Sequence, residues 1–572
     1  MTKKEILDGK DTHHFALTLL SLIATGVGFG ILMALVTNAF VIGVGKISKI
    51  REGTSWFEVS VAGINFSLTA LLAMLLAACL ILVVRRIFSI SRWHGPADSI
   101  FAAHRTDNEL DVKSGFGSTI AAFISASGGA SVGQYGPLVH FGATVGSFVR
   151  QLTNGHLSTD VYIGCGVASA IAAGFNAPIA GVVFAHEAIL RHFSFKSVTP
   201  IAVASITSAG FSKWFFGDNH AFSGLPGIDL VEVLPFALVA GPLFGMIAAA
   251  YMISLRSGGQ IAAKASLSPP KMLFLGAFIV GVVGMFLPQV LGLGTNVVLD
   301  ILNLKFGLAM LLTILVAKAI LTATCISLGF YGGIFSPAIF VGAAAGASLQ
   351  KTLAITGIYV SAPVMVVCGM AAVASAVIGA PISGVLIILE MTMSYEYALA
   401  AMLSVVTATL VSHHLYGHSF FDRQLLDRGI DISQGRSHLE MMEIPISELV
   451  SSNYVAAYKK DTKEQLLMRM LAENTTESYL IDDGVFIGKI TLNTLLKISE
   501  QSSVLEATER NPNSIKHDAS LMQAIEVASG FVGEAIPVVN REKSILIGVV
   551  TEGDIFERYL KTQRRIQDLE TS

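Results

Sequence analysis

The chain has 572 residues, of which 53% are hydrophobic and 14% are charged, and its mean hydropathy is +0.65. Soluble globular proteins rarely reach these values, so the composition predicts a polytopic membrane protein. The formal net charge of −3 and the lack of a basic block argue against a nucleic-acid partner.

Residues 1–13 are charged and lack the apolar core and cleavage site of a secretory signal, so we expect them to stay in the cytoplasm. A helix needs about 20 apolar residues to cross the hydrocarbon core of a bilayer. Runs of this length lie at residues 16–44, 64–84, 230–255, 272–293 and 308–328.

Other apolar segments are short or interrupted by Gly and Pro. They lie at residues 118–132, 179–190 and 341–353. Backbone that is not helical survives at membrane depth only where protein or a watery cavity satisfies it, so broken helices indicate a transport pathway. The four cysteines stand singly in apolar segments, which is typical of packed core residues and predicts no metal site.

Two glycine-led motifs organise this membrane region. Gly-Gln-Tyr-Gly-Pro at residues 133–137 returns 200 residues later as Gly-Ile-Phe-Ser-Pro at residues 333–337. Each motif predicts a turn followed by a helix start, because glycine relieves the steric limits on a turn and proline is tolerated in the first helical turn. Two helix N-termini that converge inside a membrane make an anion site, since they present unpaired N–H groups and partial positive charge.

A second pair of segments supports an internal repeat. Asn176–Gly181 (Asn-Ala-Pro-Ile-Ala-Gly) precedes Glu187, and Gly379–Gly384 (Gly-Ala-Pro-Ile-Ser-Gly) precedes Glu390, so the two glutamates lie 203 residues apart. The halves divide near residues 224–229, a turn region rich in Gly and Pro. Paired halves of this kind are most often related by a pseudo-two-fold axis, with the binding site near the midplane.

After Arg423 charges become frequent and long apolar runs stop, which predicts a soluble domain. Residues 534–540 and 544–550 read as strands, and a helix should run from 551 to about 559. A weaker version of this pattern covers residues 478–491, so the soluble domain is predicted to be a duplication.

Taken together, these motifs resemble the CLC family of chloride channels and proton/chloride antiporters over nearly the whole chain. The family's G-(K/R)-E-G-P, G-x-F-x-P and N-A-P-x-A-G motifs match residues 133–137, 333–337 and 176–181. The soluble domain resembles a pair of CBS domains, whose G-x-x-(S/T)-x-x-D signature is met by Gly548, Thr551 and Asp554.

The resemblance implies a homodimer in which each subunit has its own chloride pathway, lined by backbone amides at the two motifs. Such amides stabilise a partly dehydrated anion without the full charge that would trap it. The positions predicted to line or gate the pathway are Gly133, Gln134, Tyr135, Gly136, Pro137, Gly333, Ile334, Phe335, Ser336, Phe421 and His94.

Departures from the family pattern shape the functional prediction. Tyr135 stands where the family has its gating glutamate, and a phenol does not exchange protons at neutral pH. Ala188 stands where antiporters of the family often have an inner glutamate. The loop around His94 and the position of Phe421 lack the hydroxyls of the family's serine and inner tyrosine. We therefore expect a passive anion channel with chloride as its main ion. A preference for larger, weakly hydrated anions, or low discrimination between anions, is the alternative for a pathway without these two hydroxyls.

Several residues have structural alternatives to these functions. Tyr135 can be an aromatic packed at a helix start. Glu187 and Glu390 can line the pathway or accept backbone N–H groups. His186, as a partner of Glu187, and His140, one turn beyond Tyr135, are candidate proton-related residues, although a lone histidine more often packs locally.

In the soluble domain, Thr551 and Asp554 are predicted to bind the ribose of an adenine nucleotide. Their alternative function is a helix N-cap, and Thr494 replaces the acid in the first repeat. No other cofactor is expected.

The sequence thus predicts an all-α polytopic membrane protein with a C-terminal α/β CBS pair. The expected parts are residues 1–13 (cytoplasmic), 14–228 and 229–430 (membrane repeats) and 431–572 (CBS domains at about 443–500 and 501–562). We expect no enzyme, because no nucleophile–base or metal-ligand set is seen. The expected location is a bacterial plasma membrane with both termini cytoplasmic. A proton/chloride antiporter with an atypical proton route and a nucleotide-regulated sensor with a closed pore remain as alternatives.

Overall fold

The computed structural model describes residues 9–53, 58–61, 64–105, 109–153, 158–193, 195–217, 222, 224–500, 502–510, 512–540 and 545–571. Most of the expected cytoplasmic N-terminus, residues 1–8, lies outside this described part. The chain divides into two units, Met1–Ile430 and Asp431–Ser572. Each unit is described by itself below.

The first membrane half contains mainly helices of very different lengths. They are α1 (Gly9–Gly53), α2 (Thr69–Ile87), α3 (Pro96–His104), α4 (Val112–Gly128), α5 (Tyr135–Thr153), α6 (Thr159–Phe175), α7 (Pro178–Phe184), the π-helix η1 (Ala185–Leu190) and α8 (Phe195–Phe216). A hairpin of β1 (Glu58–Val61) and β2 (Ile64–Ser67) precedes α2. The apolar run predicted from residue 64 is therefore strand up to residue 67, and its helix begins at Thr69.

The second half repeats this mixture of long and short helices. They are α9 (Leu230–Lys264), α10 (Pro269–Phe286), the 3-10 helix η2 (Pro288–Val290), α11 (Thr295–Leu302), α12 (Leu308–Ser327), α13 (Phe335–Ile355), α14 (Ala362–Ile378), α15 (Pro381–Thr392), α16 (Tyr395–Tyr416) and α17 (Phe420–Leu426). Both glycine-led motifs stand at helix starts, since α5 begins at Tyr135 and α13 at Phe335.

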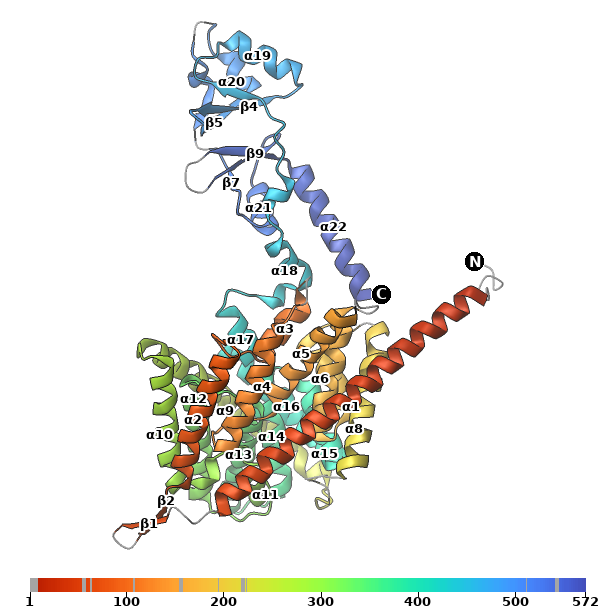
Figure 1. Cartoon of the computed structure of the whole chain (residues 1–572), viewed down its shortest axis with the longest axis vertical. Coiled ribbons are helices and arrows are strands. Elements are labelled where there is room, and N and C mark those ends of the chain that lie inside the picture. Colours follow the sequence, from red (N-terminus) through yellow and green to blue (C-terminus); the bar gives the residue numbers. More distant parts are fainter. Residues whose placement is uncertain are drawn as a thin grey trace. The chain divides into compact units, whose positions relative to one another are not determined.

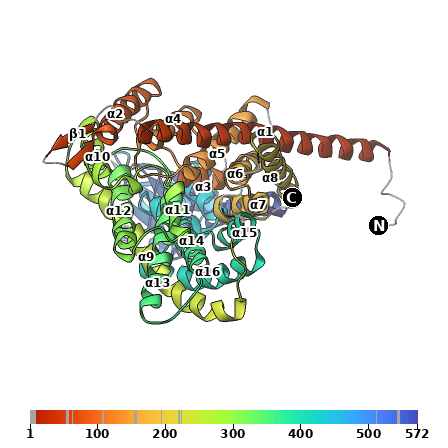
Figure 2. The same ribbon diagram turned by 90° about the horizontal axis from the view of Figure 1, so that it is seen from below.

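Seven helical segments among the described residues are long and apolar enough to cross a membrane. The short apolar helices α6, α7 with η1, α14 and α15 lie among them. Figures 1 and 2 show α1 running across one side of the unit, where it packs against α6 and α8. The pattern of long and broken helices therefore agrees with the predicted polytopic membrane fold.

In each half, glycines bring two neighbouring helices into close contact, and the pairs are equivalent in the two halves. A Cβ atom on Gly142 of α5 would lie 2.3 Å from the carbonyl oxygen of Gly166 in α6. In the second half, a Cβ atom on Gly342 of α13 would lie 2.1 Å from the carbonyl oxygen of Gly369 in α14. Since no real Cβ fits at such distances, backbone-to-backbone packing explains the glycines that follow each motif.

The C-terminal unit is built from two sheets with flanking helices. Its elements are η3 (Ile432–Gln434), α18 (Arg436–Glu443), η4 (Ile446–Leu449), β3 (Ala456–Tyr458), α19 (Lys463–Ala472), β4 (Glu477–Asp482), β5 (Val485–Thr491), α20 (Leu492–Lys497), η5 (Val504–Ala507), β6 (Thr508–Arg510), β7 (Ile515–Lys516), α21 (Leu521–Ala528), β8 (Ile536–Val539), β9 (Leu546–Val550) and α22 (Glu552–Thr571).

The two sheets share a pattern of three strands, which is the predicted duplication, and the first sheet has a fourth strand, β6, antiparallel to β5. In each, a first strand pairs parallel with a second, and the second pairs antiparallel with a third: β3, β4 and β5 in one sheet and β7, β8 and β9 in the other. Helix α22 continues to Thr571, well past the predicted end near 559. Residue 544, the predicted start of the last strand, lies outside the described residues, and β9 begins at Leu546.

Buried polar contacts join the two halves of this C-terminal unit. The Tyr479 hydroxyl donates to the carbonyl of Ala535 at 2.7 Å, and the Glu477 carboxylate accepts from the Ala535 N–H at 3.4 Å. Glu477 also forms a buried ion pair with Lys489 of its own sheet at 2.8 Å. Burial, followed by the nearby carboxylates of Glu477 and Glu534, raises the pKa of the Tyr479 hydroxyl above its ordinary value. Tyr479 therefore stays neutral and keeps this hydrogen bond across the physiological pH range.

Candidate functional site

The loops of the two glycine-led motifs bond directly to each other. Gly133 N–H donates to the carbonyl of Gly333, Gly333 N–H donates to the carbonyl of Gly133, and both distances are 2.6 Å. A Cβ atom on Gly333 would lie 2.8 Å from the backbone nitrogen of Gly136. This close approach requires glycine, and it brings together the two helix starts that the sequence predicted to converge.

Hydrogen-bond donors gather where α5 and α13 begin. The first N–H groups of a helix have no partner within it, and the aligned peptide dipoles add partial positive charge there. The Ser336 hydroxyl oxygen is also buried and has no partner among the described residues. Gln134 is buried beside these groups, 4% exposed. The arrangement can stabilise a small anion without a full positive charge.

Tyr135 occupies the start of α5 as part of an aromatic cluster. Its ring stacks on Phe175 with centroids 3.7 Å apart and meets Phe335 edge to face at 5.8 Å. Phe175 and Phe335 are themselves 5.3 Å apart, so the three rings form one cluster. The Tyr135 hydroxyl donates to the carbonyl of Gly174 at 3.3 Å. We call Tyr135, Phe175 and Phe335 the aromatic trio.

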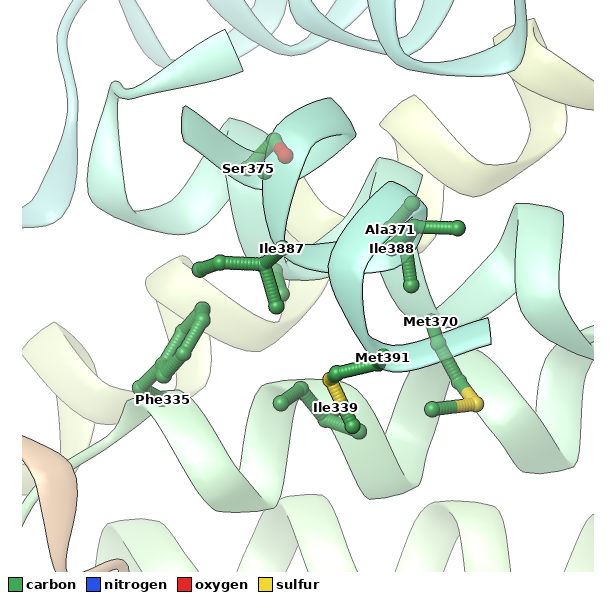
Figure 3. A pocket seen from close by; sticks show the side chains of 10 residues that line it. Phe335, Ile339, Met370, Ala371, Ser375, Ile387, Ile388 and Met391 are labelled. Atoms are coloured by element: carbon green, nitrogen blue, oxygen red, sulfur yellow. The ribbon is translucent and has the colours of Figure 1, made fainter. Parts of the chain in front are cut away.

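Phe335 also borders a small apolar cavity of about 20 Å³ between α13, α14 and α15. Figure 3 shows its ring near Ile387, with Ile339, Met370 and Met391 further along the cavity. A cavity of this volume has room for about one water molecule, but its apolar lining offers few partners. The Phe335 ring therefore packs in the aromatic trio and also lines this apolar cavity.

Three hydrogen bonds hold the loop around His94 in place. His94 N–H donates to Ser118 Oγ at 3.0 Å, and its carbonyl accepts from the Tyr331 hydroxyl. The indole of Trp93 donates to the carbonyl of Gly329 at 2.9 Å. This loop precedes α3, and it is thereby attached to the chain just before the Gly333 motif.

Phe421 lies buried on α17, which packs against α3 and α14. Its ring contacts Phe420, and within the described residues no ring contact joins it to the aromatic trio. Its predicted place in the pathway stays a prediction, as do those of the other pathway residues.

Glu187 and Glu390 act as reciprocal helix caps. The Glu187 carboxylate accepts from the backbone N–H groups of Ile382 and Ser383 at 2.9 and 2.7 Å and from the Ser383 hydroxyl at 2.6 Å. The Glu390 carboxylate accepts from the N–H groups of residues 179 and 180 at 3.0 and 2.8 Å.

Each glutamate thus caps the start of a helix in the other half. Glu187 caps α15 and Glu390 caps α7, and these two helices lie side by side (Figure 2). The contacts favour the structural alternative for both residues, because a carboxylate at a helix N-terminus satisfies unpaired N–H groups and complements the dipole.

The neighbours of Glu187 do not form a proton-transfer group with it. His186 donates through Nδ1–H to the carbonyl of His192 at 2.8 Å and stacks on Phe193 at 4.6 Å. Ala188 is buried and has no side chain that titrates.

In the C-terminal unit, Thr551 and Asp554 bond to each other at the start of α22. The Thr551 hydroxyl donates to the Asp554 carboxylate at 2.6 Å, and Asp554 N–H donates back to that hydroxyl at 3.1 Å. This is the N-cap that the sequence offered as an alternative. Both side chains are exposed, so binding of a nucleotide at this position stays a prediction.

Sequence reasoning missed Phe175 and Gly174. Both stand directly before the Asn176 motif, where an aromatic residue beside a matched motif was the available signal. The described residues contain no group of three or more His, Cys, Asp or Glu side chains placed to hold a metal ion.

The fold and the paired helix starts define a class, the membrane proteins with an internal repeat of broken helices. Residues 74–413, more than half of the chain, match the family model for the voltage gated chloride channel, and residues 504–561 match the CBS domain. The chain therefore belongs to the voltage gated chloride channel family, and it has a C-terminal pair of CBS domains.

Individual relatives agree with this assignment. A ClcB-like protein of Ralstonia nicotianae is 31% identical over 353 residues, which cover 58% of this chain and 79% of that protein. The voltage-gated ClC-type chloride channel ClcB of Escherichia coli O17:K52:H18 is 27% identical over 354 residues, which cover 60% of this chain and 84% of that one.

Solved structures share the fold at low sequence identity. A slow cyanobacterial Cl⁻/H⁺ antiporter has a TM-score of 0.63 at 20% identity, and the match covers 71% of this chain and 97% of that one. A eukaryotic CLC transporter has a TM-score of 0.61 at 17% identity over 94% of this chain and 98% of that one.

Proposed function

We propose that this chain is a passive anion channel, with chloride as its main ion, and that Tyr135 is a neutral gate. The observation that carries the proposal is the aromatic trio at the start of α5. An uncharged ring stands there, packed between Phe175 and Phe335, at the position where the resemblance expects a carboxylate.

Absence of proton coupling follows from the side chains of Tyr135 and Ala188, which stand where the resemblance expects glutamates that exchange protons. A phenol does not release its proton at neutral pH, and alanine has none to exchange. Glu187, the carboxylate next to Ala188 in the chain, is occupied by three hydrogen bonds at the start of α15. An anion that passes Tyr135 therefore has no titrating partner in these positions with which to exchange a proton.

The packing energy of the Tyr135 ring sets the barrier to opening the proposed gate. Opening requires the Tyr135 ring to leave its stacked position, and an aromatic pair contributes about 0.5 to 1.5 kcal/mol beyond area burial. Its hydrogen bond to Gly174 is long, at 3.3 Å, and adds little. A barrier of this size permits thermal opening and closing, with anions stabilised by the helix starts on either side.

The assembly and location belong to the same proposal. We propose a homodimer with one pathway in each subunit, in a bacterial plasma membrane with both termini in the cytoplasm. The chain's place in the voltage gated chloride channel family supports this picture. Neither an enzymatic activity nor a required cofactor is part of the proposal.

Chloride efflux from vesicles containing the purified protein tests the gate. Tyr135→Ala removes the ring and should increase efflux, whereas Tyr135→Phe keeps the stacking and should leave it nearly unchanged. Tyr135→Glu adds a carboxylate that competes with the anion, so efflux should fall at neutral pH and recover in acid. Equal efflux from the unmodified protein and Tyr135→Ala would contradict the gate, and no efflux from either would contradict the channel.

A further inference from the structure

Two imidazoles lie close together beside the start of α3. His94 directly precedes Gly95, the N-cap of α3, and His140 lies on α5 beyond Tyr135. Their ring centroids are 6.2 Å apart. His94 is partly exposed while His140 is fully buried, so the pair spans from an accessible surface into the protein.

Only one of the two ring nitrogens of His140 has a hydrogen-bond partner among the described residues. Its Nδ1 bonds to the Ser99 hydroxyl at 2.8 Å, whereas its Nε2 is buried and has no partner among the described residues. A buried polar atom without a partner is costly and calls for an explanation. When Ser99 donates to Nδ1, the ring hydrogen sits on Nε2, which leaves one N–H donor inside the protein for a ligand.

Two backbone donors just before α3 are already in use. Gly95 N–H donates to the Asp98 carboxylate at 2.9 Å, and His94 N–H donates to Ser118 Oγ. The side chains of His94 and His140 are further donors beside the start of α3.

The charge of Asp98 is balanced locally. Its carboxylate also accepts from Arg92 at 2.6 Å and from Arg428 at 2.9 Å, both within the membrane unit. Asp98 would otherwise repel an anion near the imidazoles, so these two guanidinium groups make the neighbourhood compatible with one.

We propose that His94 and His140 form an anion-binding station whose imidazole N–H groups set the preference for chloride over larger, weakly hydrated anions. This inference rests on the proposed channel function and adds selectivity-determining residues to it. The two N–H donors take the place of the hydroxyls that the chain lacks at the His94 loop and at Phe421. A chloride ion needs such donors more than thiocyanate does, because it loses more hydration on entering the protein.

The test measures the ratio of chloride to thiocyanate permeability from reversal potentials in planar bilayers. All variants are made in a Tyr135→Ala parent so that the gate does not limit the current. His140→Leu removes the donor and should lower the ratio about tenfold, the effect of one lost hydrogen bond to a charged group. His140→Gln keeps an N–H donor and should recover part of it, and His94→Ala should lower the ratio in the same direction.

His104→Gln is the matched control, since His104 is a buried histidine at the far end of α3 and bonds to the carbonyl of Ile100 at 2.7 Å. Its ratio should equal that of the parent. An unchanged ratio in His140→Leu, or in His94→Ala should His140→Leu fail to fold, would overturn the station while leaving the channel intact. A parent that passes no anion at all would overturn the proposed function, and the station with it.

Discussion

The reciprocal caps allow a quantitative prediction that separates structure from transport. Glu187→Ala removes a carboxylate that accepts from two backbone N–H groups and one hydroxyl, whereas Glu390→Ala removes one that accepts from two N–H groups. Hydrogen bonds to charged groups contribute about 1.5 to 3 kcal/mol, and lost helix caps cost about 0.5 to 2 kcal/mol. Both carboxylates are partly exposed, so we expect losses of about 3 kcal/mol for Glu187→Ala and about 2 kcal/mol for Glu390→Ala.

Glutamine should not rescue the first position. Its amide has one oxygen acceptor, and its NH₂ group would face an N–H donor of the capped helix. We therefore expect Glu187→Gln to be destabilised nearly as much as Glu187→Ala. A carboxylate that worked only as a proton carrier would tolerate glutamine without loss of stability.

The assay is equilibrium unfolding in mixed detergent micelles, followed by the loss of helical circular dichroism. Glu232→Ala serves as the control, because Glu232 is exposed in the first turn of α9 and its removal should change the free energy of unfolding by about 0.5 kcal/mol or less. Chloride efflux is measured on the same samples. If Glu187→Ala is as stable as the unmodified protein but has lost transport, the cap interpretation is refuted and Glu187 belongs to the pathway.

Three further predictions concern the gate, a buried cation and the C-terminal unit. Gly174→Ala would place a Cβ atom 2.8 Å from Cε1 of Tyr135, so the ring must shift and chloride efflux should rise. In a Tyr135→Ala background the same substitution should leave efflux unchanged. A rise in both backgrounds would refute direct action on the Tyr135 ring. Lys318 is fully buried and donates to the carbonyls of Val290 and Gly292 at 3.0 and 2.7 Å. Lys318→Met should therefore destabilise the protein by about 2 kcal/mol in thermal unfolding. An unchanged unfolding midpoint would contradict a stabilising role for these two hydrogen bonds. If the CBS pair binds adenine nucleotide, calorimetric titration of the full chain with ATP should show heat of binding that Asp554→Ala abolishes, and no heat in the unmodified protein would leave the N-cap as the function of that side chain.

Much of the fold was predictable because membranes restrict the possible structures. The two glycine-led motifs predicted helix starts at Tyr135 and Phe335, and α5 and α13 begin there. The glycines that follow them, Gly142 and Gly342, lie against the backbone of the neighbouring helix. The duplicated soluble domain was visible because strand periodicity and turn residues repeat along the chain.

Other features depend on contacts that no local pattern encodes. The sequence showed that Glu187 and Glu390 are related by the repeat, but their mutual exchange of helix caps depends on α7 lying against α15. Likewise, the ring of Phe175 reaches Tyr135 from a helix that starts 24 residues later in the chain, at Thr159. Motif spacing in the sequence identifies candidate residues, but the contacts between them depend on tertiary packing.

Proton movement during chloride transport tests the central claim most directly. Vesicles containing the unmodified protein are given an outward chloride gradient in weakly buffered solution, and external chloride and pH are recorded together. We predict that chloride leaves only when a potassium ionophore balances charge, with no movement of protons beyond that of protein-free vesicles. Uphill proton movement that stops when the chloride gradient is removed would contradict the account, because neither Tyr135 nor Ala188 can carry that proton.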